Sequence, residues 1–372
     1  MFSATLRRGL VPVLCLLAGP ALSGPAEDCR NLDIEAADSI APCTAAIKAA
    51  TDPAERADLL LWRASSYKSV EDYWRAEADI AAALALRPDW ADPFVERAYL
   101  LKAQGNTEGA LAAAQQSLET EPTSVLAHKT VMSMLADAGR WQDCLDLAPR
   151  ALELGPDDPE TLANRGRCLT DGGDDEAAVA DYRRAIGLGL EEFYVHSNLA
   201  LSLLNLGRPA EALPEAQVAV SLDASNIFAQ LNLIRALAET DDVAGAIEAY
   251  RTAAPAAEAM DRTNLANTLA WGLYENGHMS EALPFAEEAT SAMRESGEPN
   301  PDLLDTYAHL LAANGRPQDA ANAFLEVVET DPARQANYVK NLGKLGFLSD
   351  PSDLTASFLA CAKTGAACRL WE

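Results

Sequence analysis

Basic side chains are scarce in this sequence. Its 372 residues include 29 lysines and arginines against 56 aspartates and glutamates, and the formal net charge is −27. Such a surface repels nucleic-acid phosphates and anionic lipid head groups. We therefore expect no nucleic-acid partner.

Catalytic and metal-binding motifs are also absent. The sequence has no C-x-x-C, H-E-x-x-H, G-x-S-x-G or G-x-x-x-x-G-K-[ST], and its four histidines are scattered. One S-x-x-K spacing occurs, at Ser65 and Lys68, but no K-T-G or S-D-N follows it. We expect no enzymatic activity, no metal and no cofactor.

The apolar run near the N-terminus is short. It follows Arg7 and Arg8 and precedes Ala21 and Ser23, at the spacing that signal peptidase recognises. The run is too short for a permanent membrane helix. We expect residues 1–23 to be a Sec-type signal peptide, and the mature protein to be periplasmic or secreted without a membrane span. An uncleaved anchor is the alternative.

Cleavage would change both the charge and the cysteine count. It would remove two arginines and no acid, which leaves 27 basic against 56 acidic residues and a net charge of −29. It would also leave six cysteines, and an even number in an exported chain predicts disulfides. In chain order these are Cys29 with Cys43, Cys144 with Cys168, and Cys361 with Cys368.

The sequence repeats with a period of 34 residues. Aligning residues 91–124 with 159–192 places Ala98 over Gly166 and Gly105 over Gly173. Eight repeats follow from this register, the last two after insertions of two and four residues. They begin at Ala57, Ala91, Val125, Pro159, Phe193, Ile227, Thr263 and Pro301.

Each repeat predicts two helices. Positions 4, 7, 8 and 11 form one helix face, as in His196, Leu199, Ala200 and Leu203. Glycine at position 15 ends that helix in six of the repeats. Small residues at positions 20 and 27 mark a second helix, and proline or a polar turn closes the unit near position 32.

These positions resemble the tetratricopeptide repeat family, over residues 57–332. The resemblance implies an all-α fold, a right-handed α-solenoid whose first helices line a concave groove. Arg63, Arg97 and Arg165 depart from it by replacing the apolar residue at position 7, and we expect them to pair with nearby acids.

The expected groove is a candidate binding site for an extended peptide. Positions 2, 6, 9 and 13 lie opposite the packed face. Position 6 reads Thr130, Asn164, Asn198, Asn232, Thr268 and Thr306. In peptide-binding members of the family, asparagine at this position often contacts the ligand backbone, and the alternative is that it bonds neighbouring helices. Further candidates at positions 2 and 9 are Tyr194, Phe228, Tyr99, Arg167, Arg235, Trp271 and His309. This mixture favours a peptide with acidic and apolar side chains.

The sequence predicts a capping segment at each end of the solenoid. Residues 24–56 contain a half-repeat that should cover the first unit. Residues 333–372 predict a helix from Arg334 to Leu345, a turn, a helix from Asp353 to Ala362, and a disulfide. The tail also resembles exported peptidoglycan-binding modules, although it lacks their D-G-x-x-G turn, and a plain cap is the alternative.

The repeat register pairs two cysteines. In tetratricopeptide stacking, position 27 is expected to face position 3 of the next repeat, so position 20 should face position 10. Cys144 and Cys168 occupy these two positions. We expect a disulfide between them, with two buried thiols as the alternative.

The sequence thus predicts an exported scaffold or adapter that binds a protein or peptide partner in the cell envelope. An accessory subunit of an envelope enzyme and a purely structural spacer are the alternatives. The oligomeric state and the identity of the partner do not follow from the sequence.

Overall fold

The computed structural model describes residues 24–31, 35–348 and 353–370. The predicted signal peptide lies outside these residues. The chain divides into two compact units, Met1–Ala138 and Gly139–Glu372. Apart from one short 3₁₀ segment, all regular structure within the described residues is α-helical. The prediction of an all-α solenoid is confirmed.

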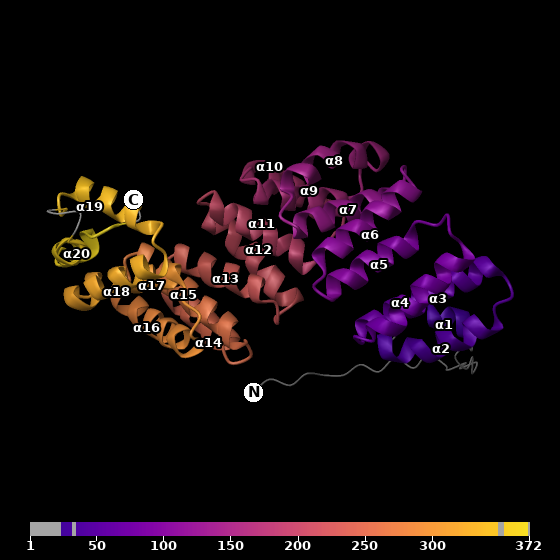
Figure 1. Ribbon diagram of the computed structural model, residues 1–372, viewed down its shortest axis with the longest axis horizontal. Coiled ribbons are helices and arrows are strands. Elements are labelled where there is room, and N and C mark those ends of the chain that lie inside the picture. The colour runs from indigo at the N-terminus through magenta and orange to yellow at the C-terminus, as the bar shows by residue number, and fades with distance from the viewer. Residues whose placement is uncertain (1–23, 32–34, 349–352, 371–372) are drawn as a thin grey trace, which may run out of the picture. The chain divides into compact units, whose positions relative to one another are not determined.

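Unit 1 begins with a short helix, α1, and a longer one, α2, and continues with antiparallel pairs (Figure 1). Its helices are α1 (Pro25–Cys29), α2 (Ala36–Ala49), α3 (Pro53–Ser69), α4 (Tyr73–Leu86), α5 (Asp92–Ala103), α6 (Thr107–Thr120) and α7 (Val125–Asp137). Helix α3 packs against α4, and α5 packs against α6.

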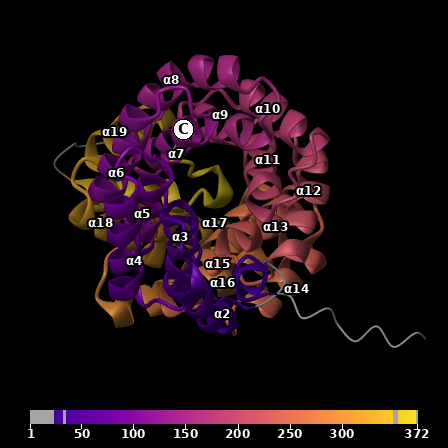
Figure 2. The ribbon, with the colours of Figure 1, turned by 90° about the vertical axis from the view of Figure 1, so that its right-hand side faces the viewer.

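Unit 2 contains the other helices. They are α8 (Trp141–Leu154), α9 (Pro159–Asp171), α10 (Asp175–Gly187), α11 (Phe193–Asn205), α12 (Pro209–Leu222), α13 (Ile227–Glu239), α14 (Val243–Ala253), α15 (Ala259–Glu275), α16 (Met279–Ser296), α17 (Pro301–Ala313), α18 (Pro317–Thr330), α19 (Arg334–Leu345), α20 (Leu354–Ala362) and the 3₁₀ segment η1 (Gly365–Ala367). Figure 2 shows α9, α11 and α13 on the inner side of this unit's curve, and α10, α12 and α14 on the outer side.

The repeat register locates most first helices. Helices α7, α9, α11, α13 and α17 each begin at the first residue of a predicted repeat. Helix α15 begins at Ala259, four residues before the predicted start at Thr263, because the two-residue insertion follows the short α14. The hydrophobic period therefore fixes the helices more reliably than it fixes their ends.

Position 15 ends the first helix with a left-handed residue. Six repeats have glycine there, at φ between 67° and 88°. In the first and sixth repeats the same position is Glu71 (φ 60°) and Asp241 (φ 65°), the two non-glycine residues with positive φ among those described. The turn geometry is thus kept even where glycine is missing, at a cost in backbone strain.

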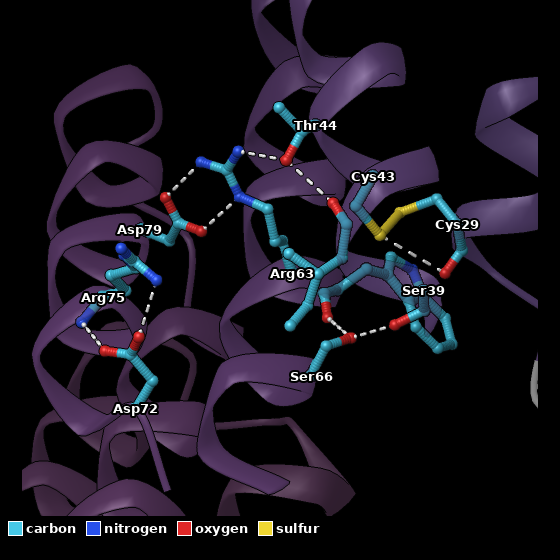
Figure 3. A network of polar contacts seen from close by, with 11 residues as sticks. Cys29, Ser39, Cys43, Thr44, Arg63, Ser66, Asp72, Arg75 and Asp79 are labelled. Atoms are coloured by element: carbon cyan, nitrogen blue, oxygen red, sulfur yellow. Dashed lines mark hydrogen bonds and ion pairs between the residues drawn. A yellow bond between two sulfur atoms is a disulfide. The ribbon is translucent and has the colours of Figure 1, made fainter. Parts of the chain in front are cut away.

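The position-7 arginines pair with acids, as predicted. Figure 3 shows the Arg63 guanidinium donating to both carboxylate oxygens of Asp79, each at 2.7 Å. Arg165 donates to both oxygens of Asp181 at 2.6 Å, and this hydrogen bonding raises the pKa of Arg165. Arg63 and Arg165 therefore reach from the first helix of a pair to the second, whereas Arg97 on α5 donates to Glu77 on α4 of the preceding pair.

Three disulfides link neighbouring elements within the units. They join Cys29 to Cys43, Cys144 to Cys168 and Cys361 to Cys368. The second has a Cα–Cα distance of 6.3 Å and connects α8 to α9, where both cysteines are fully buried. This is the pairing that the repeat register predicts.

The C-terminal residues fold against the last pair. Helix α20 packs on α18, and Phe358 stacks on Phe324 at a centroid distance of 5.4 Å. The helix from Arg334 to Leu345 begins and ends where the sequence predicts. Peptidoglycan binding by this tail stays a prediction. Among the described helices, none has the length and hydrophobicity needed to cross a membrane.

Candidate functional site

A pocket of about 710 Å³ opens between α13 and α15 in unit 2. Three of its lining residues, Arg235, Thr268 and Trp271, are predicted site residues. The turn between α11 and α12 forms one edge. The full lining comprises Gly207, Pro209, Arg235, Glu239, Asn267, Thr268, Trp271, Gly272, Glu275 and Asn276.

Close packing of two first helices forms the pocket floor. A Cβ atom added at Gly272 would lie only 2.7 Å from the Cβ of Ala238, so these small residues let α13 and α15 approach each other directly. The indole of Trp271 lies one residue before Gly272 and 5.7 Å, centroid to centroid, from the ring of Tyr274. Gly272 thus sets the distance across which the other pocket side chains face one another.

Arg235 does not project freely into this pocket. Its Nε donates to Glu239 Oε1 at 2.6 Å, one turn along α13. Its two terminal nitrogens lie 3.4 Å from the Asn205 side-chain oxygen and from the Leu204 carbonyl oxygen. The charge of the guanidinium is therefore already balanced within the wall.

Asn267 is a pocket residue that the sequence reasoning missed. Its side-chain oxygen is buried and has no hydrogen-bond partner among the described residues. Asn267 is at position 5 of its repeat, outside the predicted groove positions 2, 6, 9 and 13. Position 5 is adjacent to position 6 on the helix. Two extra residues precede this repeat, and the sequence does not show how far they rotate α15 about its axis.

The row at position 6 is not an open ladder. Asn232 is 9% exposed and donates to the carbonyl oxygen of Ser197 at 2.9 Å and to its hydroxyl at 3.1 Å. Thr130 is fully buried and donates to the Leu126 carbonyl at 2.7 Å. The expectation that these two residues contact a peptide is wrong for this structure, because they bond to helices of the protein itself.

The other candidates lie outside the pocket. Asn164 and Arg167 are partly buried on α9, and Asn198 is partly buried on α11. Tyr194 is 36% exposed at the start of α11, and Phe228 is 69% exposed at the start of α13. Their assignment to a peptide site stays a prediction.

Comparison with known proteins finds tetratricopeptide repeats in part of the chain. The sequence profile of the tetratricopeptide repeat family matches residues 135–191, 177–227 and 197–261. Together these matches span residues 135–261, and helix pairs of the same kind occur on both sides of them. The chain carries tetratricopeptide repeats.

Several solved structures are similar to the chain. The Cut9–Hcn1 hetero-tetramer of APC/C aligns with a TM-score of 0.59 and 12% identity, over 91% of this chain and 62% of that chain. Pseudomonas aeruginosa PilF aligns at 0.46 and 18%, over 57% and 94%. YrrB, described as having an unusual peptide-binding site, aligns at 0.42 and 17%, over 50% and 94%. At these identities the likeness concerns the fold. A comparison with curated proteins finds no significant match.

In the last helix pair, α17 and α18, the C-terminal residues of the chain cover His309 on the inner face. His309, at position 9, is fully buried, and its Nε2 accepts a hydrogen bond of 3.1 Å from the backbone N–H of Leu370. Asn341 on α19 donates to the Leu370 carbonyl oxygen at 2.7 Å. His309 is therefore a contact of the C-terminal cap, and the groove candidate at this position is corrected.

Proposed function

We propose that this chain is an exported scaffold that holds an extended segment of an envelope protein along the inner side of unit 2. Tetratricopeptide repeats are protein-binding modules and are generally not catalytic, and stacked repeats use their concave face for binding. The pattern of residues 1–23 and the six paired cysteines support export.

The pocket beside Trp271 is the observation that carries this proposal. It combines a partly buried aromatic ring with the Asn267 oxygen, which is buried without a hydrogen-bond partner among the described residues. A buried acceptor without a hydrogen bond is costly, and a ligand that donates to it removes that cost. A peptide segment can supply such a donor.

Site-specific photo-crosslinking tests the location of the partner. A photoreactive phenylalanine analogue replaces Thr268 in the pocket, and in a second variant it replaces Glu248, which is exposed on α14 outside the pocket. Irradiation in an envelope extract should yield a discrete adduct from position 268 and none from position 248. Equal adducts at both positions, or no adduct at position 268, would contradict binding at this pocket.

A further inference from the structure

Two oxygen acceptors of the pocket have no partner among the described residues. The Asn267 oxygen is buried without a partner, and the Glu275 carboxylate makes no ion pair or hydrogen bond with any described residue. Glu239 adds a second carboxylate, which Arg235 already engages. The wall therefore has two oxygen acceptors, on Asn267 and Glu275, that no described residue satisfies.

The charges of the wall point the same way. Its charged residues are one arginine and two glutamates, and the arginine is paired with Glu239 at 2.6 Å. No unpaired cation remains in the lining to receive a carboxylate ligand. A cationic ligand, by contrast, would meet the Glu275 carboxylate and the face of Trp271, which attracts cations through its π electrons.

We propose that this pocket takes a lysine or arginine side chain of the bound segment. The inference rests on the proposed function, since it names the side chain that the peptide site selects. The ammonium or guanidinium group donates to the Asn267 oxygen, pairs with Glu275 and lies against Trp271. This replaces, for the pocket, the sequence-based expectation of an acidic ligand side chain, which assumed that Arg235 was available.

The net charge of the chain supports a basic partner. With a formal charge of −27, the protein attracts cationic segments over distances of about the Debye length and repels acidic ones. This long-range attraction does not determine where on the protein a basic segment binds. The local acceptors of the pocket supply that choice.

Peptide titrations followed by NMR test the proposal on the full mature protein. The probes are five-residue alanine peptides with blocked ends, whose central residue is arginine, lysine, glutamine or glutamate. The readout is the indole N–H signal of Trp271, assigned by its loss in W271F. The arginine and lysine peptides should bind at least about tenfold more tightly than the glutamine peptide, because a charged donor makes a stronger hydrogen bond.

Three variants locate the effect. N267L should reduce the affinity for the arginine peptide about tenfold, and E275Q about threefold because this carboxylate is exposed. E248Q changes the net charge by the same amount as E275Q, on a surface outside the pocket, and should leave the affinity unchanged. If N267L fails to fold, the affinities of E275Q and E248Q for the arginine peptide still test the proposal.

The outcomes separate this inference from the proposed function. If the glutamate or glutamine peptide binds at Trp271 as tightly as the arginine peptide, selection of a basic residue is overturned and binding in the groove survives. If no peptide moves the Trp271 signal while the crosslink at position 268 forms, the basic-residue inference is again overturned. If both fail, the proposed site is wrong as well.

Discussion

Asn232 donates its side-chain amide to the carbonyl oxygen of Ser197, 35 residues earlier, at 2.9 Å. The bond joins α13 to α11, the first helices of two successive repeats. A residue that sequence alone places on a ligand-binding row thus connects the repeats themselves. The contact also distinguishes Asn232 from Asn198, which lies at the same position one repeat before.

Replacing these two asparagines should have different effects on stability. Asn232→Ala should lower the free energy of unfolding by about 1–2 kcal/mol, because it deletes a buried hydrogen bond. Asn198→Ala should change it by less than about 0.5 kcal/mol, because its side chain has no hydrogen bond within the described residues. Urea denaturation followed by circular dichroism measures both. Equal losses would show that Asn232 has no special role between repeats.

Glu71 should be a site of backbone strain. Its φ of 60° is at the position where six other repeats have glycine. Glu71→Gly should raise the unfolding free energy by up to about 1 kcal/mol, because glycine adopts this conformation without a steric cost. Ser69→Gly, at the end of α3, is the matched control and should not stabilise. Thermal melts of the two variants test this, and a destabilised Glu71→Gly protein would contradict it.

The disulfide between Cys144 and Cys168 should stabilise the fold by roughly 3 kcal/mol, because it closes a loop across a sequence separation of 24 residues in the unfolded chain. The Cys144→Ser, Cys168→Ser double variant should lose that amount in denaturant titrations. Non-reducing peptide mapping checks the pairing itself. A free thiol at Cys168 in the mature protein would refute it.

Glu211 should titrate far below an ordinary glutamate. Hydrogen bonds from Arg208, and then from Arg183 on α10, lower the pKa of Glu211 to about 2. Since the folded pKa is depressed, the contribution of this carboxylate to stability is present above about pH 4.3 and is lost as the pH falls towards 2. Carboxyl ¹³C shifts measured by NMR report the pKa. Arg183→Gln should raise it, and an ordinary value in the unmodified protein would contradict the pairing.

Export should yield a mature protein that begins at Gly24. Expression of the full chain in a bacterial host, followed by intact mass measurement of the envelope fraction, tests this. Ala21→Leu should block cleavage, because signal peptidase requires small residues before the cut. Recovery of the full-length chain in the membrane, with residues 1–23 retained, would instead support the uncleaved anchor.

The repeating architecture follows from the amino-acid sequence alone. A period of 34 residues gave the helix pairs and the start of α9 at Pro159. The same register, combined with the stacking that the tetratricopeptide resemblance implies, placed Cys144 opposite Cys168. The sequence also predicted that Arg165 pairs with a nearby acid, and the structure identifies that acid as Asp181.

Tertiary packing decided which inner-face groups are available to a ligand. Spacing fixes the side of a helix on which a residue lies, but the distance to the next helix depends on the volumes at the contact, such as Gly272 against Ala238. That distance decides that Asn232 bonds to Ser197 and that the Asn267 oxygen is left without a partner. The distance between two helices depends on the side chains of both, so the sequence of a single repeat does not predict it.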